Sequence, residues 1–237
     1  MKHPGQEFYE DWASQQLSNP ERDIVLEWKA IHLANLFRSN FPRIQINSVC
    51  EVGGAEGTVI ASVGRLLGAN NLDCYELSDE FCRIGSMRHS NVSFVNGNFE
   101  VCQSDYDIGI LSDITEHVED DDYLLKNVCT RCRYVLLKMP IEVCIAGSQW
   151  RYRLQGKLKP RNMLFGKDHY NGHLRGYTVK SALVLVERHF KIIDYYLLDP
   201  SFYYHGGKRF NWLRRWVGIK PLTWLVGGSL FVLGARN

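Results

Sequence analysis

Short apolar runs alternate with segments of helical periodicity between residues 44 and 137. Strands that alternate with helices form a mainly parallel sheet with helices on both faces. The predicted fold class is therefore α/β, and ligands should bind beyond the carboxyl ends of the strands. The expected strands are 44–52, 72–77, 92–95, 106–111 and 134–137, and the expected helices are 58–67, one beginning at 78–80, and 121–130.

The alternation stops after Pro140 and returns near the C-terminus. Before the first strand, Asn19-Pro20 is a helix start that is followed by apolar residues at helical spacing. We expect an N-terminal helical segment at 1–44 and one domain at 45–237. Within that domain we expect two cap insertions and the last three regular elements. The insertions are about 141–176 and 199–228, the helix is 178–189, and the strands are 190–198 and 229–235.

Charge is divided unevenly along the chain. Residues 1–130 carry 9 basic and 21 acidic side chains, and residues 131–237 carry 19 basic and 5 acidic ones. The basic half is expected to face an anionic ligand: a phosphorylated or nucleotide-linked substrate, an acidic glycan, a nucleic acid or a lipid headgroup. A solvated basic face without a ligand is the alternative. Nucleic acid is disfavoured, because the basic residues lie in the cap insertions and no RNA-binding module is appended.

Nothing in the sequence predicts a membrane span or a secretory leader. The N-terminus is polar and acidic, and the apolar C-terminal stretch is interrupted by Gly227-Gly228, which favours a loop and a buried strand. Seven cysteines show no disulfide spacing, and Cys129 and Cys132 form a lone CxxC, so no zinc site is expected. We expect reduced thiols in a cytoplasmic protein, with contact at a membrane surface left open.

The first expected strand ends in a carboxylate and a glycine-rich loop, Glu51-Val-Gly-Gly-Ala-Glu-Gly57. Glycine admits a ligand close to the main chain, so a strand, such a loop and then a helix are typical of nucleotide binding. A dinucleotide loop requires the spacing GxGxxG, which these glycines do not have. The spacing therefore opposes an NAD-dependent reductase. The pattern that fits is acid-x-Gly-x-small-x-Gly.

At these residues the chain resembles the class I S-adenosylmethionine-dependent methyltransferases, especially the small-molecule branch that includes the ubiquinone-biosynthesis O-methyltransferases. The resemblance covers about residues 45–140 and resumes at 172–198 and in the final strand. It implies a Rossmann-like, mostly parallel seven-stranded sheet, with S-adenosylmethionine as cofactor and S-adenosylhomocysteine as product. This chain has Ala55 where the family usually has its middle glycine.

The resemblance also implies roles for residues at the strand ends. Glu51 would accept from the cofactor's ammonium group or from loop amides, and Glu76 would accept from both ribose hydroxyls. The alternative for Glu76 is an acid that favours the start of the next helix. Asn98 would contact the adenine amino group, with Phe99 against the ring. The expected cofactor-binding residues are Glu51, Gly53, Gly54, Gly57, Glu76, Leu77, Asn98, Phe99, Ser112 and Asp113.

The segment after the fourth strand carries the candidate catalytic residues. His117 is a candidate general base, with a structural hydrogen-bonding role as its alternative. The pattern acid-x-x-Glu-His resembles the metal-binding pattern of ubiquinone-type O-methyltransferases and small-RNA 2′-O-methyltransferases. It implies, as a hypothesis, a divalent ion held by Asp113, Glu116, His117 and His173, with His169 competing for the last place. The candidate catalytic residues are Glu116, His117 and His173.

Aromatic residues are interspersed with the basic residues of the two cap insertions: Tyr152, Tyr170, Tyr203, Tyr204, Trp212 and Trp216. Arginine beside aromatic rings suits a sugar ring that bears a phosphate or a carboxylate. The predicted function is therefore O-methylation of a small anionic or glycan-type acceptor. An N-methyltransferase and a catalytically silent binding module of the same fold are the alternatives.

Overall fold

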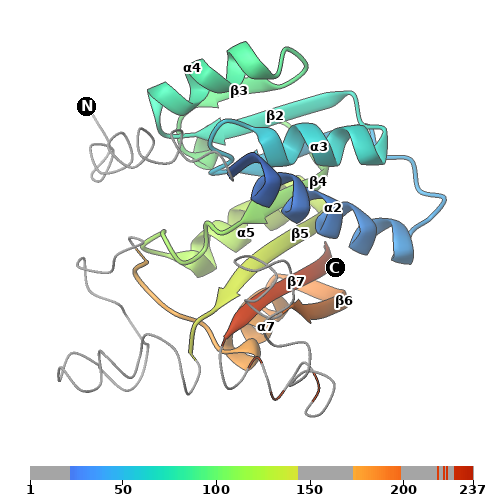
Figure 1. Cartoon of the computed structure of the whole chain (residues 1–237), viewed down its shortest axis with the longest axis vertical. Helices are drawn as coiled ribbons and strands as arrows, with labels where there is room; N and C mark the ends of the chain where they lie inside the picture. Colours follow the sequence, from blue (N-terminus) through green and yellow to red (C-terminus); the bar gives the residue numbers. More distant parts are fainter. Residues whose placement is uncertain are drawn as a thin grey trace.

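The computed structural model describes residues 22–143, 173–198 and 227–236, with the single positions 218, 221 and 223. The described strands form one seven-stranded sheet with the order β3-β2-β1-β4-β5-β7-β6 (Figure 1). The five strands from β3 to β5 are parallel to their neighbours, and β7 runs antiparallel to β5 and β6. The strands are β1 Ser48–Val52, β2 Asn71–Glu76, β3 Ser93–Asn96, β4 Tyr106–Ser112, β5 Cys132–Ile141, β6 Phe190–Leu198 and β7 Gly228–Arg236.

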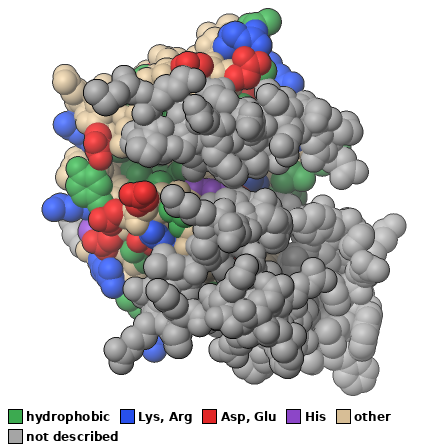
Figure 2. Space-filling model, turned by 90° about the vertical axis from the view of Figure 1, so that its left-hand side faces the viewer, with side chains coloured by type: hydrophobic (Ala, Val, Ile, Leu, Met, Phe, Trp, Pro, Cys, Tyr) green, Lys and Arg blue, Asp and Glu red, His purple; other side chains and the backbone are tan. Residues whose placement is uncertain are grey.

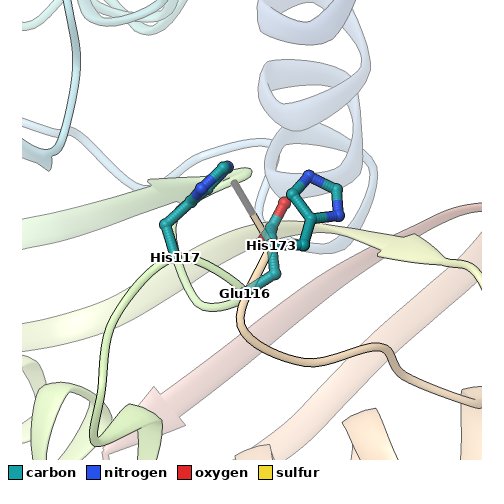
Figure 3. A group of neighbouring side chains, drawn as sticks. All are labelled: Glu116, His117 and His173. Atoms are coloured by element: carbon teal, nitrogen blue, oxygen red, sulfur yellow. The ribbon is translucent and has the colours of Figure 1, made fainter. Parts of the chain in front are cut away.

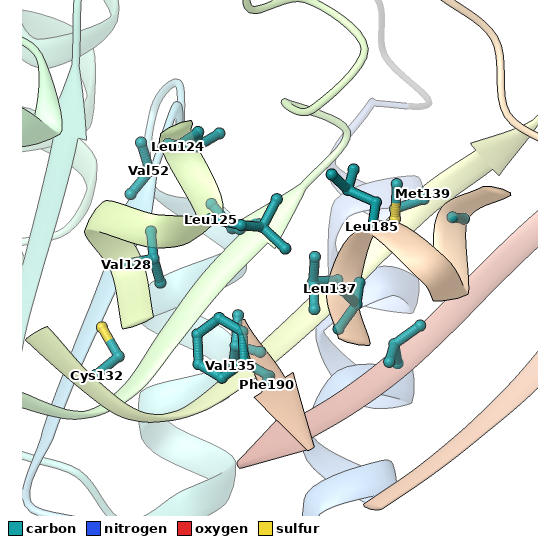
Figure 4. Close-up of a cluster of buried hydrophobic side chains, with 14 of the residues drawn as sticks. Val52, Leu124, Leu125, Val128, Cys132, Val135, Leu137, Met139, Leu185 and Phe190 are labelled. Carbon is teal, nitrogen blue, oxygen red and sulfur yellow. The ribbon is translucent and has the colours of Figure 1, made fainter. Parts of the chain in front are cut away.

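Helices cover both faces of this sheet, as the alternation predicts. The helices are α2 Arg22–Asn40, α3 Thr58–Leu67, α4 Asp79–Arg88, the 3-10 turn η1 Phe99–Val101, α5 Asp121–Arg131 and α7 Val179–Glu187. Buried residues of α2 and α3 pack with one face of the central strands. Buried residues of α5 and α7 pack with the other face, where Leu125, Leu137 and Phe190 lie in one cluster (Figure 4). The α/β fold class is confirmed.

The helix starts follow the capping residues. Ser78 accepts a hydrogen bond from the Phe81 amide, and Asp120 accepts one from the Tyr123 amide. Thr178 and Ser181 form a capping box at the start of α7. The α3 helix lies between two glycines with left-handed backbone, Gly57 and Gly68. These starts agree with the predicted helices to within a residue.

Two strands differ in length from the prediction. β1 begins at Ser48 instead of residue 44, and the amides of Asn47 and Ser48 bind the Asp107 carboxylate. β5 extends through Pro140 to Ile141, well past residue 137. The reason is its antiparallel pairing with β7, which runs from Tyr134 to Ile141. The short predicted strand was wrong because local sequence does not show this partner.

Most of the cap region lies outside the described residues. Of the expected insertions, only 141–143, 173–176 and isolated positions near 218–228 are described. The aromatic residues expected to line the acceptor side, and His169, lie outside the described ranges. Within those ranges, no helix is both long enough and apolar enough to cross a membrane.

Candidate functional site

The glycine loop connects β1 to α3 and has three residues in left-handed backbone, Gly53, Ala55 and Gly57. A Cβ on Gly53 would lie 2.5 Å from Ile114 Cδ1, and one on Gly57 would lie 2.6 Å from the Phe94 ring. These positions require glycine for both conformation and space. Ala55 takes a φ of 50°, a conformation that costs an L-residue free energy. A glycine at this position would take this conformation without that cost.

Glu51 lies under the loop instead of facing outward. Its side chain is buried, and Oε2 accepts a hydrogen bond from the Ile60 amide in the first turn of α3 at 3.0 Å. A Cβ on Gly54 would lie 2.9 Å from the same oxygen. Burial raises the pKa of Glu51 to about 8, although the Ile60 amide and the Lys29 ammonium both oppose the shift.

Glu76 joins the loop to the next helix. It is the last residue of β2, with Oε1 accepting from the Ser78 amide and Oε2 from the Ala55 amide, each at 2.9 Å. Each oxygen can accept a further hydrogen bond. Burial raises the pKa of this carboxyl, and the backbone amides partly offset the effect. Glu76 therefore organises the glycine loop from the end of β2.

The other expected cofactor residues follow the next strand ends. Leu77 follows Glu76, and its carbonyl accepts a bond from the Asn96 side chain. Asn98 precedes η1 and makes no side-chain capping bond. Phe99 is buried with its ring edge-on to Tyr75, so it belongs to the core.

Ser112 ends β4, and its Oγ is buried without a hydrogen-bond partner among the described residues.

Asp113, an expected member of both the cofactor site and the metal site, is held by two lysines. Lys29 from α2 binds Oδ2 at 2.7 Å, and Lys138 from β5 binds Oδ1. The backbone of Asp113 is left-handed, with a φ of 55°. Burial would raise the pKa of Asp113, but the two ammonium groups outweigh it and hold the pKa far below its usual range. Asp113 is not in the cluster that Glu116 forms with the histidines.

Glu116, His117 and His173 come together although 56 positions separate the last two. Their ligand atoms lie within 4.8 Å of one another, and the histidine rings are edge-to-face with centroids 4.8 Å apart (Figure 3). Glu116 is fully buried, and its Oε1 has no hydrogen-bond partner among the described residues. An unsatisfied buried carboxylate oxygen facing two imidazoles is a donor set that fits a divalent cation.

Electrostatics within this cluster favour the protonated form of both Glu116 and His173. Burial, followed by the neighbouring Asp113, raises the pKa of Glu116 to about 7. For His173, burial disfavours the cation, but the carboxylate of Glu142, 2.7 Å from Nδ1, outweighs it and raises the pKa. A histidine with Nδ1 bound to a carboxylate is a common arrangement among metal-binding histidines.

Backbone and side-chain contacts fix the segment that carries His173. The Leu174 amide donates to the Glu116 carbonyl at 2.8 Å. The Tyr177 hydroxyl lies 2.7 Å from Asp121 Oδ2 and 3.1 Å from the Thr115 carbonyl, and Arg175 forms an ion pair with Asp121 at 2.6 Å.

Figure 2 is turned toward the left-hand side of Figure 1 and shows a histidine side chain near the centre of that face.

Four residues that contact the candidate site were not identified from the sequence. Lys138 carried a usable signal, since it is the single charge in the otherwise apolar part of β5 from residue 134 to residue 141. Lys29, Arg22 and Glu142 carried none, because their roles depend on partners distant in the chain.

Solved structures similar to this chain include methyltransferases. Magnesium protoporphyrin IX methyltransferase (ChlM) from Synechocystis PCC 6803, with bound S-adenosylhomocysteine, has 11% identity and a TM-score of 0.67, covering 100% of this chain and 99% of that one. The N-methyltransferase NodS from Bradyrhizobium japonicum WM9, also with S-adenosylhomocysteine, has 9% identity and a TM-score of 0.60, covering 96% and 97%. The N-terminal domain of EvdMO1 has 14% identity and a TM-score of 0.55, covering 88% and 81%.

No protein-family model and no curated protein sequence matches the chain. At identities between 9% and 14%, these structural similarities carry the fold alone.

Proposed function

We propose that this chain, which has the class I S-adenosylmethionine-dependent methyltransferase fold, binds S-adenosylmethionine and methylates a hydroxyl of a small anionic or glycan-type acceptor. The observation that carries the proposal is the position of Glu76. Its carboxylate ends β2, holds the amide of Ala55 in the glycine loop, and retains acceptor capacity on both oxygens. A ribose with two adjacent hydroxyls suits such a carboxylate.

The fit of the cofactor rests on the loop. Gly53 and Gly57 have left-handed backbone and no room for a Cβ, so the path of the loop requires glycine at both positions, and glycine lets a ligand approach the main chain closely. Asn98 follows β3 with its side chain free of a capping role, as adenine recognition requires. When bound, S-adenosylmethionine supplies the activated methyl group, and the protein supplies alignment and removal of a proton from the acceptor.

His117 is proposed as the general base for the acceptor hydroxyl, with Glu116 and His173 as its neighbours. His173 is less suited, because its partner Glu142 favours the protonated imidazole. As an alternative role for the same cluster, Glu116, His117 and His173 would hold a divalent ion, which lowers the pKa of a bound hydroxyl. The unsatisfied Glu116 oxygen supports this alternative.

The proposal of an anionic or glycan-type acceptor is based on the basic residues of the two expected cap insertions, about 141–176 and 199–228. The EvdMO1 domain has also been crystallised in the presence of S-adenosylhomocysteine and D-fucose, which is consistent with a sugar-type acceptor in this fold. NodS is an N-methyltransferase, so methylation of a nitrogen is the nearest alternative. A silent binding module would bind the cofactor without turnover.

Calorimetric titration of the full chain with S-adenosylmethionine, S-adenosylhomocysteine and NAD tests the proposal. We expect micromolar binding of the first two, none of NAD, and about a tenfold or greater loss in Glu76→Ala. Glu80→Ala is the matched control, since Glu80 is an exposed acid in the first turn of α4. Equal affinity in wild type and Glu76→Ala, or tight NAD binding, contradicts the proposal. Release of S-adenosylhomocysteine during acceptor screening separates the enzyme from the silent module.

A further inference from the structure

The histidine cluster is assembled from two segments that are distant in the sequence. Glu116 and His117 lie in the loop between β4 and α5, whereas His173 lies in the segment that precedes α7 (Figure 3). The edge-to-face contact of the two histidine rings therefore depends on how these segments are held together. Any residue that joins the two segments also sets the position of one imidazole relative to the other.

Asp121, the first residue of α5, joins the two segments through both of its carboxylate oxygens. Oδ1 binds the Arg175 guanidinium at 2.6 Å, and Oδ2 accepts a hydrogen bond from the Tyr177 hydroxyl at 2.7 Å. Arg175 and Tyr177 lie two and four positions after His173. Hydrogen bonds to a charged group are short and strong, so one carboxylate that binds both residues fixes the chain directly after His173.

Further contacts of the same two residues complete the link. The Arg175 guanidinium also donates to the Glu119 carbonyl, and the Tyr177 hydroxyl lies 3.1 Å from the Thr115 carbonyl. The Tyr177 carbonyl accepts a hydrogen bond from the Val143 amide, just after the end of β5. The segment before α7 is thus connected both to the loop after β4 and to the chain that leaves β5.

Stability alone is a weak reason for this arrangement. Taking charged groups out of water costs free energy that a buried ion pair often only offsets, whereas a satisfied network of hydrogen bonds holds one defined geometry. The side chains of Arg175 and Asp121 are only 13% and 20% exposed, and Tyr177 is buried. The neighbouring acid Asp122 differs, because its ion pairs with Arg188 and His189 involve no residue of the segment before α7.

We propose that Asp121 is a positioning residue that holds the segment of His173, and with it the imidazole, against the loop that carries His117. In this role Asp121 contacts neither cofactor nor acceptor and acts only through the position of the imidazole. A displacement of about 1 Å can cost an enzyme about 100-fold in rate, so such a constraint matters for methyl transfer. The inference rests on the proposed function for the catalytic importance of the cluster, but the position of the rings can be measured without a ligand.

The test compares Asp121→Asn with Asp122→Asn in the full chain. Both variants remove one charge from the first turn of α5, but only the first removes the charge that binds Arg175. The isotope-labelled histidine rings are followed by proton–carbon NMR without a ligand, and His117→Gln and His173→Gln assign the two signals. Because aromatic rings shift the resonances of nearby protons, His173→Gln reports the edge-to-face contact as a shift of the His117 signal. Thermal unfolding of each variant checks that it is folded.

We expect Asp121→Asn to move the His117 and His173 signals and to reduce the shift that His173→Gln causes in the His117 signal. Tyr177→Phe keeps the buried ring and loses only the hydroxyl, so it should give smaller changes of the same kind and serves where Asp121→Asn does not fold. Asp122→Asn should leave both signals in place.

Wild-type positions of both histidine signals in folded Asp121→Asn, or in Tyr177→Phe where the first variant is unfolded, would overturn the positioning role. S-adenosylhomocysteine should bind Asp121→Asn as tightly as the wild type, since Asp121 lies outside the glycine loop. A wild type that does not bind S-adenosylhomocysteine contradicts the proposed function instead, and the NMR comparison still decides the role of Asp121.

Discussion

Arg22 donates two hydrogen bonds to Glu56, from Nε to Oε1 at 2.8 Å and from Nη2 to Oε2 at 2.7 Å. Arg22 begins α2, whereas Glu56 lies in the glycine loop and its side chain has no exposed surface. Burial alone would raise the pKa of Glu56, but the guanidinium outweighs it and lowers the pKa. A bidentate, buried ion pair therefore attaches the N-terminal helix to the candidate cofactor loop.

Glu56→Gln should destabilise the fold by about 3 kcal/mol, because it removes the buried carboxylate charge that binds the Arg22 guanidinium through two hydrogen bonds. Urea unfolding at neutral pH measures this. The double variant with Arg22→Met should lose less than the sum of the two single variants. Glu80→Gln, in an exposed pair with Arg83, should have almost no effect. Strict additivity of Arg22→Met and Glu56→Gln would show that the pair contributes nothing as a pair.

Gly57→Ala should cost more stability than Gly68→Ala. Both glycines have left-handed backbone, which costs alanine about 1–2 kcal/mol, but only at Gly57 does the new Cβ meet a neighbour, the Phe94 ring at 2.6 Å. Gly68 has nothing within 4 Å of that position. The difference between the two free energies of unfolding isolates the steric part. Gly57→Ala should also weaken S-adenosylhomocysteine binding, while Gly68→Ala should not. Equal losses in both variants would rule out the contact as the reason for glycine.

Stability should depend on the ionisation of Glu51. Its pKa is about 8 in the folded protein against about 4.5 in the unfolded chain, so the folded state binds a proton more tightly. The free energy of unfolding of the wild type should therefore fall as pH rises between these two values and level off above about 8. Glu51→Gln keeps an acceptor for the Ile60 amide and cannot ionise, so its stability relative to the wild type should increase across the same window. Urea unfolding at several pH values checks this, and a pH-independent difference would refute it.

The Glu116, His117 and His173 cluster should bind a transition metal if the divalent-ion alternative is right. Titration with Co²⁺ followed by visible absorption reads the binding directly, without an acceptor. His173→Ala should abolish the signal, and Glu142→Gln should weaken the affinity by about 10- to 100-fold, because Glu142 orients the ligand.

His89→Ala is the control for this titration, since His89 lies at the end of α4 near Thr58 and outside the cluster. It should leave Co²⁺ binding unchanged. Identical titrations of wild type and His173→Ala would dismiss the metal site and leave His117 as the proposed base. Exhaustive chelation should then leave methyl transfer unaffected.

The sequence by itself determined the α/β fold and the glycine loop, because both depend on local properties. Apolar periodicity places β2 and α3 within a residue of their observed bounds, and Ser78 and Thr178 mark helix starts through bonds to residues three positions away. The left-handed backbone at Gly57 is similarly local, since few other residues adopt it.

Only the tertiary structure decided which charges pair. Asp113 was expected to join Glu116 in a metal site because acid-x-x-Glu-His resembles a metal-binding pattern, yet it binds Lys29 and Lys138, which the sheet order and the packing of α2 bring to it. The full length of β5 likewise depends on β7, which follows nearly ninety residues later in the chain. Charge and strand pairing are interactions across space, and a carboxylate's sequence neighbours do not show which ammonium will be folded against it.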